Sequence, residues 1–285
     1  MQLRRVMDDV TIAEVIQLTQ AAGDEILEVY NSDFDVQTKA DTSPLTQADL
    51  AAHAVIVAGL KVLTPDVPVL SEESEAPPFE IRKNWQRYWL VDPLDGTKEF
   101  VNRNGEFTVN IALIEQGQPT FGVVAVPVQD CVYVGDVPRL NAYCIEGRGG
   151  ANKQRPLHGR PMAEQQGITI VASRSHGGER LEKFVASVET QFAPLQRTPV
   201  GSSLKLCILA EGQADFYPRL GPTSEWDIGA AHAVLAAAGG EVWAADGQPL
   251  TYNAKESLLN PEFFAVADAG YPWRTQLPEV PPLGD

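Results

Sequence analysis

The sequence contains few cysteines, and they are not spaced as a staple or a metal site requires. Cys131, Cys144 and Cys207 are the three cysteines among 285 residues, an odd number with no CxxC spacing. This usage argues against a disulfide framework and a zinc site, and it fits a chain that stays in a reducing cytosol. We therefore expect three buried thiols that behave as small apolar side chains.

Positive charge and long apolar runs are also scarce. The chain has 22 Lys and Arg against 38 Asp and Glu, a net charge of −16, which disfavours nucleic-acid polymers and anionic lipid as partners. No run of about 18 apolar residues suggests a membrane span, and the start, Met1-Gln2-Leu3-Arg4-Arg5, does not resemble a signal peptide. We expect a cytoplasmic protein without transmembrane contact, at most peripheral on the cytoplasmic face of the inner membrane.

An apolar period of three to four residues predicts two helices near the N-terminus. The first covers 11–30, and the second runs from about Thr46 to Leu63. Thr46 is a good N-cap, and Asp49 stands three residues later, where a capping box places an acidic partner.

The rest of the chain divides into two patterns. After short strands at 67–70 and 88–91, separated by a loop or lid at 76–84, a period of two predicts an antiparallel meander over 107–135. A loop follows at 146–160, with a soft boundary near 150–165. The last third alternates strands and helices, which is α/β organisation: strands at 168–172, 214–217 and 241–244, and helices at 179–188, 204–210 and 227–238.

A turn rich in oxygen ligands follows the strand that ends at Val91. In Asp92-Pro93-Leu94-Asp95-Gly96-Thr97, proline and glycine force a tight turn that presents two carboxylates and the Leu94 carbonyl together. Such hard ligands suit Mg²⁺ or Mn²⁺. Thr97 then begins a short helix, whose free N–H groups could cradle a phosphate. The plainer interpretation is a loop whose carboxylates cap neighbouring amides.

Two further acidic segments stand at the ends of predicted elements. Glu72 and Glu73 follow a short strand, and Asp227 begins a helix behind Trp226. A solvated acidic loop would explain Glu72, and an N-cap would explain Asp227. Together with the turn, however, the three segments favour a metal-dependent hydrolytic site.

These segments resemble the signatures of the inositol monophosphatase superfamily. In chain order the signatures are Ser43–Asp49, Leu70–Glu73, Val91–Thr97 and Glu225–Ala231, and they span nearly the whole chain. Further segments are similar to those of its bacterial 3′(2′),5′-bisphosphate nucleotidases: Trp85–Asp92, Asn104–Asn110, Gly201–Lys205, Tyr217–Arg219 and Gly221–Thr223.

The resemblance implies the fold. We expect an α/β (α+β) protein, a layered αβαβα sandwich of the inositol monophosphatase and fructose-1,6-bisphosphatase type. Residues 1–155 would form an N-terminal α+β part with most metal ligands. Residues 156–285 would form a C-terminal α/β part with Asp227 and the specificity residues, packed with the first as one compact monomer or homodimer.

The resemblance also implies the reaction. The enzyme would be a lithium-sensitive, Mg²⁺-dependent phosphatase of sulfur metabolism, acting on the 3′-phosphate of adenosine 3′,5′-bisphosphate (PAP) and also on its phosphosulfate analogue (PAPS). Two or three Mg²⁺ would be bound, with Mn²⁺ as a substitute and Li⁺ and Ca²⁺ as inhibitors. The implied metal ligands are Glu72, Asp92, the Leu94 carbonyl, Asp95 and Asp227. Asp49 and Thr97, assisted by Glu72, would orient and deprotonate the attacking water, although a capping role alone would also explain Asp49.

Substrate contacts are expected from two sources. The metal site and its turn would contribute Glu72, Leu94, Asp95, Gly96, Thr97 and Asp227. Beyond them, Lys205 and Arg219 are candidates for the second phosphate, and Ser203 for a phosphate or ribose oxygen. Ser175 and His176 follow a strand end and could meet the nucleoside, although His176 is equally well explained as a surface histidine. The alternatives are a phosphatase of the same fold acting on inositol monophosphate or a sugar phosphate, and a non-catalytic metal- or nucleotide-binding regulator.

Overall fold

Two long helices form the outermost layer of the N-terminal half. The computed structural model describes residues 7–32, 44–147, 153–172 and 178–282. Helix α1 (Asp9–Tyr30) begins after Asp8, whose carboxylate accepts the Thr11 N–H at 2.8 Å. Helix α2 (Pro44–Leu63) packs along it. Both predicted helices are confirmed.

The predicted start of α2 is wrong. The helix begins at Pro44, because the fixed φ angle of proline suits the first helical position. Thr46 therefore lies inside the first turn and is not the N-cap, and Asp49 is not the partner in a capping box. The window Thr46–Leu63 is, within the described residues, the one stretch long and apolar enough to cross a membrane by length and composition. Its residues Ala48, Ile56 and Leu60 are buried in the core that α2 forms with α1 and the first sheet.

Seven strands form the first sheet, in chain order. They are β1 (Val69–Ser71), β2 (Arg87–Asp95), β3 (Thr108–Glu115), β4 (Gln118–Val126), β5 (Cys131–Asp136), β6 (Asn141–Glu146) and β7 (Lys153–Pro156). β1 pairs parallel to β2, and every later pair is antiparallel. The meander is confirmed, but it continues through β6 and β7 into the predicted loop at 146–160. Short helices α3 (Phe79–Arg82), inside the predicted loop at 76–84, and α4 (Thr97–Val101) flank β2.

The second sheet has five strands in the order β11-β12-β10-β8-β9. Its strands are β8 (Ile168–Ala172), β9 (Leu195–Pro199), β10 (Phe216–Arg219), β11 (Glu241–Ala244) and β12 (Phe263–Val266). The helices of this half are α5 (Glu179–Phe192), α6 (Leu204–Ala210), α7 (Glu225–Ala237) and α8 (Trp273–Gln276). Every element predicted here exists: β8, α6 and β11 have the predicted bounds, and α5, β10 and α7 have shifted ends. Strands β9 and β12 and helix α8 were not predicted.

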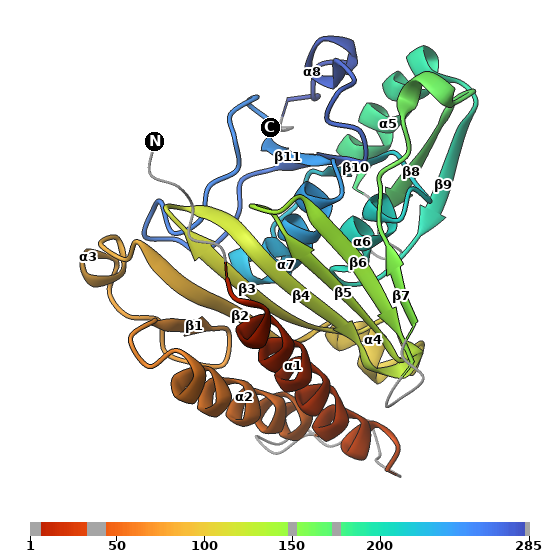
Figure 1. Ribbon diagram of the computed structural model, residues 1–285. Helices are drawn as coiled ribbons and strands as arrows, with labels where there is room; N and C mark the ends of the chain where they lie inside the picture. The colour runs from red at the N-terminus through yellow and green to blue at the C-terminus, as the bar shows by residue number, and fades with distance from the viewer. Residues whose placement is uncertain (1–6, 33–43, 148–152, 173–177, 283–285) are drawn as a thin grey trace.

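The layers stack in the order α1/α2, seven-stranded sheet, α6/α7, five-stranded sheet, α5/α8 (Figure 1). The buried helix α7 can lie against the first sheet because the strands present glycine to it. A Cβ at Gly122 would stand 2.2 Å from the Ala230 carbonyl oxygen, and one at Gly135 would stand 2.4 Å from the Cα of Val234. The predicted αβαβα sandwich is confirmed. Because α7 packs on β3, β4 and β5, the helix that carries Asp227 reaches the strand that carries Asp92.

Candidate active site

The carboxyl end of β2 brings the predicted metal-binding turn into the interior. Asp92 is 1% exposed, and its carboxylate accepts the Leu94 N–H at 3.1 Å. The pairing of β2 with β3 shifts between Asp92 and Asp95, so the strand bends where the ligands lie. Gly96 follows with φ +101°, a left-handed conformation that favours glycine, and α4 begins at Thr97.

Parallel pairing explains why Glu72 lies beside this turn. The carboxyl ends of β1 and β2 meet at the same edge, and the Glu72 N–H donates to the Val91 carbonyl at 3.1 Å. Glu72 is exposed at this edge as a whole residue, although neighbouring groups remove much of the water from its carboxylate. The sequence alone could not show the parallel pairing, but it is what places two distant acidic segments together.

Asp227 comes to the same place from the first turn of α7. Ser224, not Asp227, is the N-cap of this helix, and the Asp227 carboxylate accepts the Ser224 N–H through Oδ2 at 2.8 Å. The N-cap interpretation of Asp227 is therefore wrong. Its other carboxylate oxygen is not involved in that capping bond.

The acidic groups raise one another's pKa values. The pKa of Asp92 is well above its ordinary value because the group is buried and then because Asp95, Glu72 and Asp227 lie nearby. Burial and Asp227 raise the pKa of Asp95 to about 7, partly opposed by Lys205. The pKa values of Glu72 and Asp227 are raised as well, chiefly by burial. Such a cluster of like charges is costly unless cations neutralise it.

The donor set suits a hard divalent cation. Within the described ranges, no three Asp, Glu, His or Cys side chains lie close enough together to coordinate one metal ion. Mg²⁺ does not need such a cage, since it usually keeps several waters and takes only one or two carboxylates per ion. Carboxylates that surround a common space and feel one another's charge fit that mode of binding.

Asp49 lies close to the cluster and is not used for helix capping. Its Oδ1 is buried and has no hydrogen-bond partner among the described residues. Burial, followed by Glu73 and Glu72, raises its pKa to about 8. Thr97 is exposed at the start of α4. Asp49 is therefore a buried carboxyl group beside the cluster whose pKa lies near the neutral range, and its catalytic role stays a prediction.

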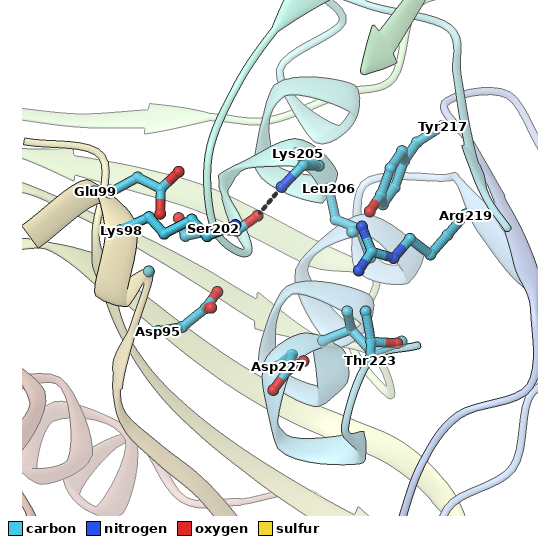
Figure 2. Close-up of a pocket in the computed structure, with 12 residues that line it drawn as sticks. Asp95, Lys98, Glu99, Ser202, Lys205, Leu206, Tyr217, Arg219, Thr223 and Asp227 are labelled. Atoms are coloured by element: carbon cyan, nitrogen blue, oxygen red, sulfur yellow. Dashed lines mark hydrogen bonds between the residues drawn. The ribbon is translucent and has the colours of Figure 1, made fainter. Parts of the chain in front are cut away.

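A pocket of about 140 Å³ opens beside Asp95 and Asp227. Figure 2 shows the two carboxylates entering from different elements, with Lys205 and Arg219 on the opposite side of the pocket. Lys205 is 7% exposed; its Nζ donates to the Ser202 carbonyl at 2.9 Å and lies 5.8 Å from the Tyr217 ring centre. Burial lowers the pKa of Lys205, while Asp95 opposes that shift.

The remaining predicted contacts have different outcomes. The Ser203 hydroxyl forms hydrogen bonds within the protein, to Thr108 Oγ1 at 2.8 Å and to Asn110 Oδ1 at 2.7 Å; its role as a substrate contact stays a prediction. Ser175 and His176 lie outside the described residues. Ser202 and Lys98 also line the pocket, and neither was predicted as a site residue. For Lys98 a signal existed in the sequence, since it directly follows the turn that was predicted to cradle a phosphate.

The chain is similar to known phosphatases over most of its length. The model of the inositol monophosphatase family matches residues 7–271. The 3′(2′),5′-bisphosphate nucleotidase CysQ of Escherichia coli K12 is 50% identical over 257 residues, which cover 88% of this chain and 97% of that protein. The nucleotidase CysQ of Haemophilus influenzae is 35% identical, covering 92% and 94%.

Solved structures agree with these relatives. The crystal structure of CysQ from Bacteroides thetaiotaomicron, described as a bacterial member of the inositol monophosphatase family, superimposes with a TM-score of 0.79 at 40% identity, covering 90% of this chain and 96% of that one. An inositol monophosphatase from Zymomonas mobilis has a TM-score of 0.73 at 22% identity, covering 93% and 95%, which supports the fold alone.

Proposed function

The chain belongs to the inositol monophosphatase family, and we propose that it is a metal-dependent 3′(2′),5′-bisphosphate nucleotidase that converts PAP to AMP and phosphate. The observation that best supports PAP as the substrate is the pair of cationic side chains, Lys205 and Arg219, in the pocket beside Asp95 and Asp227. A monophosphate of a neutral polyol needs one anion site, whereas a bisphosphate needs two. The 50% identity to a nucleotidase of that name supports the same conclusion.

Mg²⁺ would be held by Glu72, Asp92, the Leu94 carbonyl, Asp95 and Asp227. When bound, it lowers the pKa of water and neutralises charge on the attacking and leaving oxygens. We propose two or three ions, replaceable by Mn²⁺ and opposed by Li⁺ and Ca²⁺. The support is the excess of carboxylates with raised pKa values at this end of β2.

The proton of the attacking water would pass to Asp49, oriented with Thr97 and Glu72. In the metal-free protein a pKa of about 8 keeps Asp49 largely protonated at neutral pH; cations held beside it would lower that pKa and leave a carboxylate that can accept the proton. The Gly96 and Thr97 amides, at the start of α4, would donate hydrogen bonds to the phosphoryl oxygens. Hydrolysis then needs no covalent intermediate, since positioning and charge neutralisation suffice for phosphoryl transfer.

The nucleotide would extend from the metals across the basic pocket. Lys205 and Arg219 would hold the 5′-phosphate. Behind Arg219 and Tyr217 lies a second pocket of about 180 Å³, whose walls include the apolar side chains of Leu181 and Leu220. We assign the adenosine to this second pocket, because a purine needs an apolar wall and the two pockets share Tyr217 and Arg219. PAPS, which has the same 3′-phosphate, would bind in the same way.

Location, assembly and domain organisation are proposed as well. We propose a cytoplasmic enzyme, at most peripheral on the membrane, that acts as a monomer or homodimer. We also retain the division into a metal-binding part, 1–155, and a specificity part, 156–285.

The test compares phosphate release from PAP, adenosine 3′-monophosphate and inositol 1-phosphate, with Mg²⁺ and with a chelator. We expect PAP to have the highest kcat/KM and the chelator to abolish turnover. A preference for inositol 1-phosphate would support the inositol phosphatase alternative. Binding of PAP without turnover of any ester would support the regulator.

A further inference from the structure

The first turn of α7 is held by a segment that lies after the helix in the chain. Glu225 is 2% exposed, and its Oε2 accepts the Asn253 N–H at 2.8 Å. The Glu225 N–H donates to the Leu258 carbonyl at 2.8 Å. Asn260 Nδ2 donates to the Ser224 carbonyl at 2.7 Å. The turn that carries Asp227 is thus fixed by groups outside its own helix.

Arg82, in α3, holds the other side of this segment. Arg82 is 2% exposed; its guanidinium donates to Asn253 Oδ1, to the Lys255 carbonyl at 3.2 Å and to the Glu256 carbonyl. Asn253 returns a hydrogen bond from Nδ2 to the Arg82 carbonyl at 2.6 Å. Arg82, Asn253 and Glu225 therefore form a continuous chain of polar contacts through the interior.

This series of polar contacts joins the two segments that would contribute metal ligands from outside β2. One is the segment of Glu72, which continues into α3 and Arg82; the other is the first turn of α7. We propose that Arg82, Asn253 and Glu225 are positioning residues that hold Asp227 in place relative to Glu72 for metal binding. The inference rests on the proposed Mg²⁺-dependent function.

A purely stabilising role explains the network less well. Arg82 Nε and the Tyr88 hydroxyl, which lies close enough to Glu225 to feel its charge, are buried without hydrogen-bond partners in the described part of the chain. Incompletely satisfied buried polar groups cost stability, and apolar side chains would avoid that cost. Such a cost is expected where function constrains the interior.

The central test compares two substitutions at Glu225. E225Q keeps an oxygen that can accept the Asn253 N–H, whereas E225A removes it. Loss of a group that orients a metal ligand typically weakens metal affinity about 10–100-fold, so we expect E225A to weaken Mg²⁺ binding by about tenfold and E225Q by far less. Mg²⁺ affinity is measured by calorimetry on the folded protein without substrate, and KM for PAP is then measured at saturating Mg²⁺.

Two further variants separate positioning from folding. N253G removes the side-chain link to Arg82 but keeps the backbone N–H and suits the φ of +54° at this position; R82M removes the guanidinium. Both should weaken Mg²⁺ binding and leave KM for PAP near the wild-type value. D215N is the matched control, because it disrupts a buried ion pair with Arg160 far from α3 in the chain and should lower stability without changing Mg²⁺ affinity.

The inference is overturned if E225A and N253G lower thermal stability as D215N does yet bind Mg²⁺ as tightly as wild type. It is also overturned if E225Q weakens Mg²⁺ binding as much as E225A. R82M can fail to fold, and the Glu225 pair with N253G then decides the matter. A wild-type chain that hydrolysed PAP equally well without a divalent cation would instead remove the proposed function, and the two failures are therefore distinguishable.

Discussion

Asp92 and Asp215 are both buried aspartates, but their surroundings differ in kind. Asp215, 0% exposed, accepts Arg160 Nε at 2.6 Å and the Thr169 N–H at 2.6 Å. Asp92, 1% exposed, accepts the Leu94 N–H at 3.1 Å and otherwise faces other carboxylates, which raise its pKa. The first arrangement is complete within the protein, and the second needs a cation from outside. The difference separates a structural carboxylate from a functional one without reference to any motif.

The largest effect should come from removing a charge at the incomplete site. D95N keeps the shape of Asp95 but removes its negative charge and one of its two ligand oxygens. Losing several kcal/mol of charge stabilisation corresponds to a fall in kcat of about 10²–10³-fold, measured as phosphate release from PAP. Circular dichroism should show an unchanged fold, and wild-type activity in D95N would contradict the metal scheme.

Substitution at the Asp215–Arg160 ion pair should lower stability and leave activity unchanged. D215N leaves Arg160 without its charged partner, so the free energy of unfolding should fall by about 2–3 kcal/mol. Activity per folded molecule should be unchanged, because Asp215 touches no predicted ligand. Denaturant titration with parallel assays tests this, and a selective loss of activity would show that Asp215 is not merely structural.

Substitution of the buried cation in the pocket should change substrate preference. K205M removes one of two proposed partners of the 5′-phosphate, and losing a charged hydrogen bond of about 1.5–3 kcal/mol raises KM for PAP about 10–100-fold. Adenosine 3′-monophosphate, which lacks that phosphate, is the matched substrate, and its KM should change little. Equal losses with both substrates would mean that Lys205 serves the metal site.

The smallest effect should come from an exposed pair. Arg274 and Glu241 approach to 2.6 Å, but their side chains are 42% and 37% exposed. Water screens such pairs, so E241Q should change the free energy of unfolding by less than about 0.5 kcal/mol and leave turnover unchanged. A loss as large as that of D215N would show that exposure does not decide the strength of these pairs.

Much of the fold followed from local patterns in the sequence. Periodicity predicted α1, α2 and the meander, because their apolar residues alternate with the period of the element. It missed β7, whose sequence Lys-Gln-Arg-Pro lies on the rim of the sheet with little apolar burial. It also missed β9 and β12, which are short and acquire their strand pairing from distant neighbours.

The site was predictable in its residue types but not in its geometry. The turn at Asp92 and Asp95 carries its own signature, whereas Glu72 reaches it through parallel pairing and Asp227 through the packing of α7. Ser203 illustrates the limit of sequence patterns, because a hydroxyl at a helix start gives no sign that Thr108 and Asn110 already bind it. Glu225 lies one residue before Trp226 and gives no sign of its contact with Asn253.

The central claim is that the carboxylates gathered at the end of β2 destabilise the fold when they are ionised and are stabilised by a bound cation. Thermal unfolding tests this claim most directly. Because folding raises the pKa of Asp95 from 3.8 to about 7, the folded state keeps a proton that the unfolded chain has lost, and stability must fall as pH rises through that window. The measurement compares wild type and D95N, metal-free and with Mg²⁺, at pH 5 and pH 8. We expect metal-free wild type to lose more stability than D95N at pH 8, and Mg²⁺ to restore it in wild type but far less in D95N. The same pH dependence in both proteins, with no stabilisation of wild type by Mg²⁺, would contradict the account.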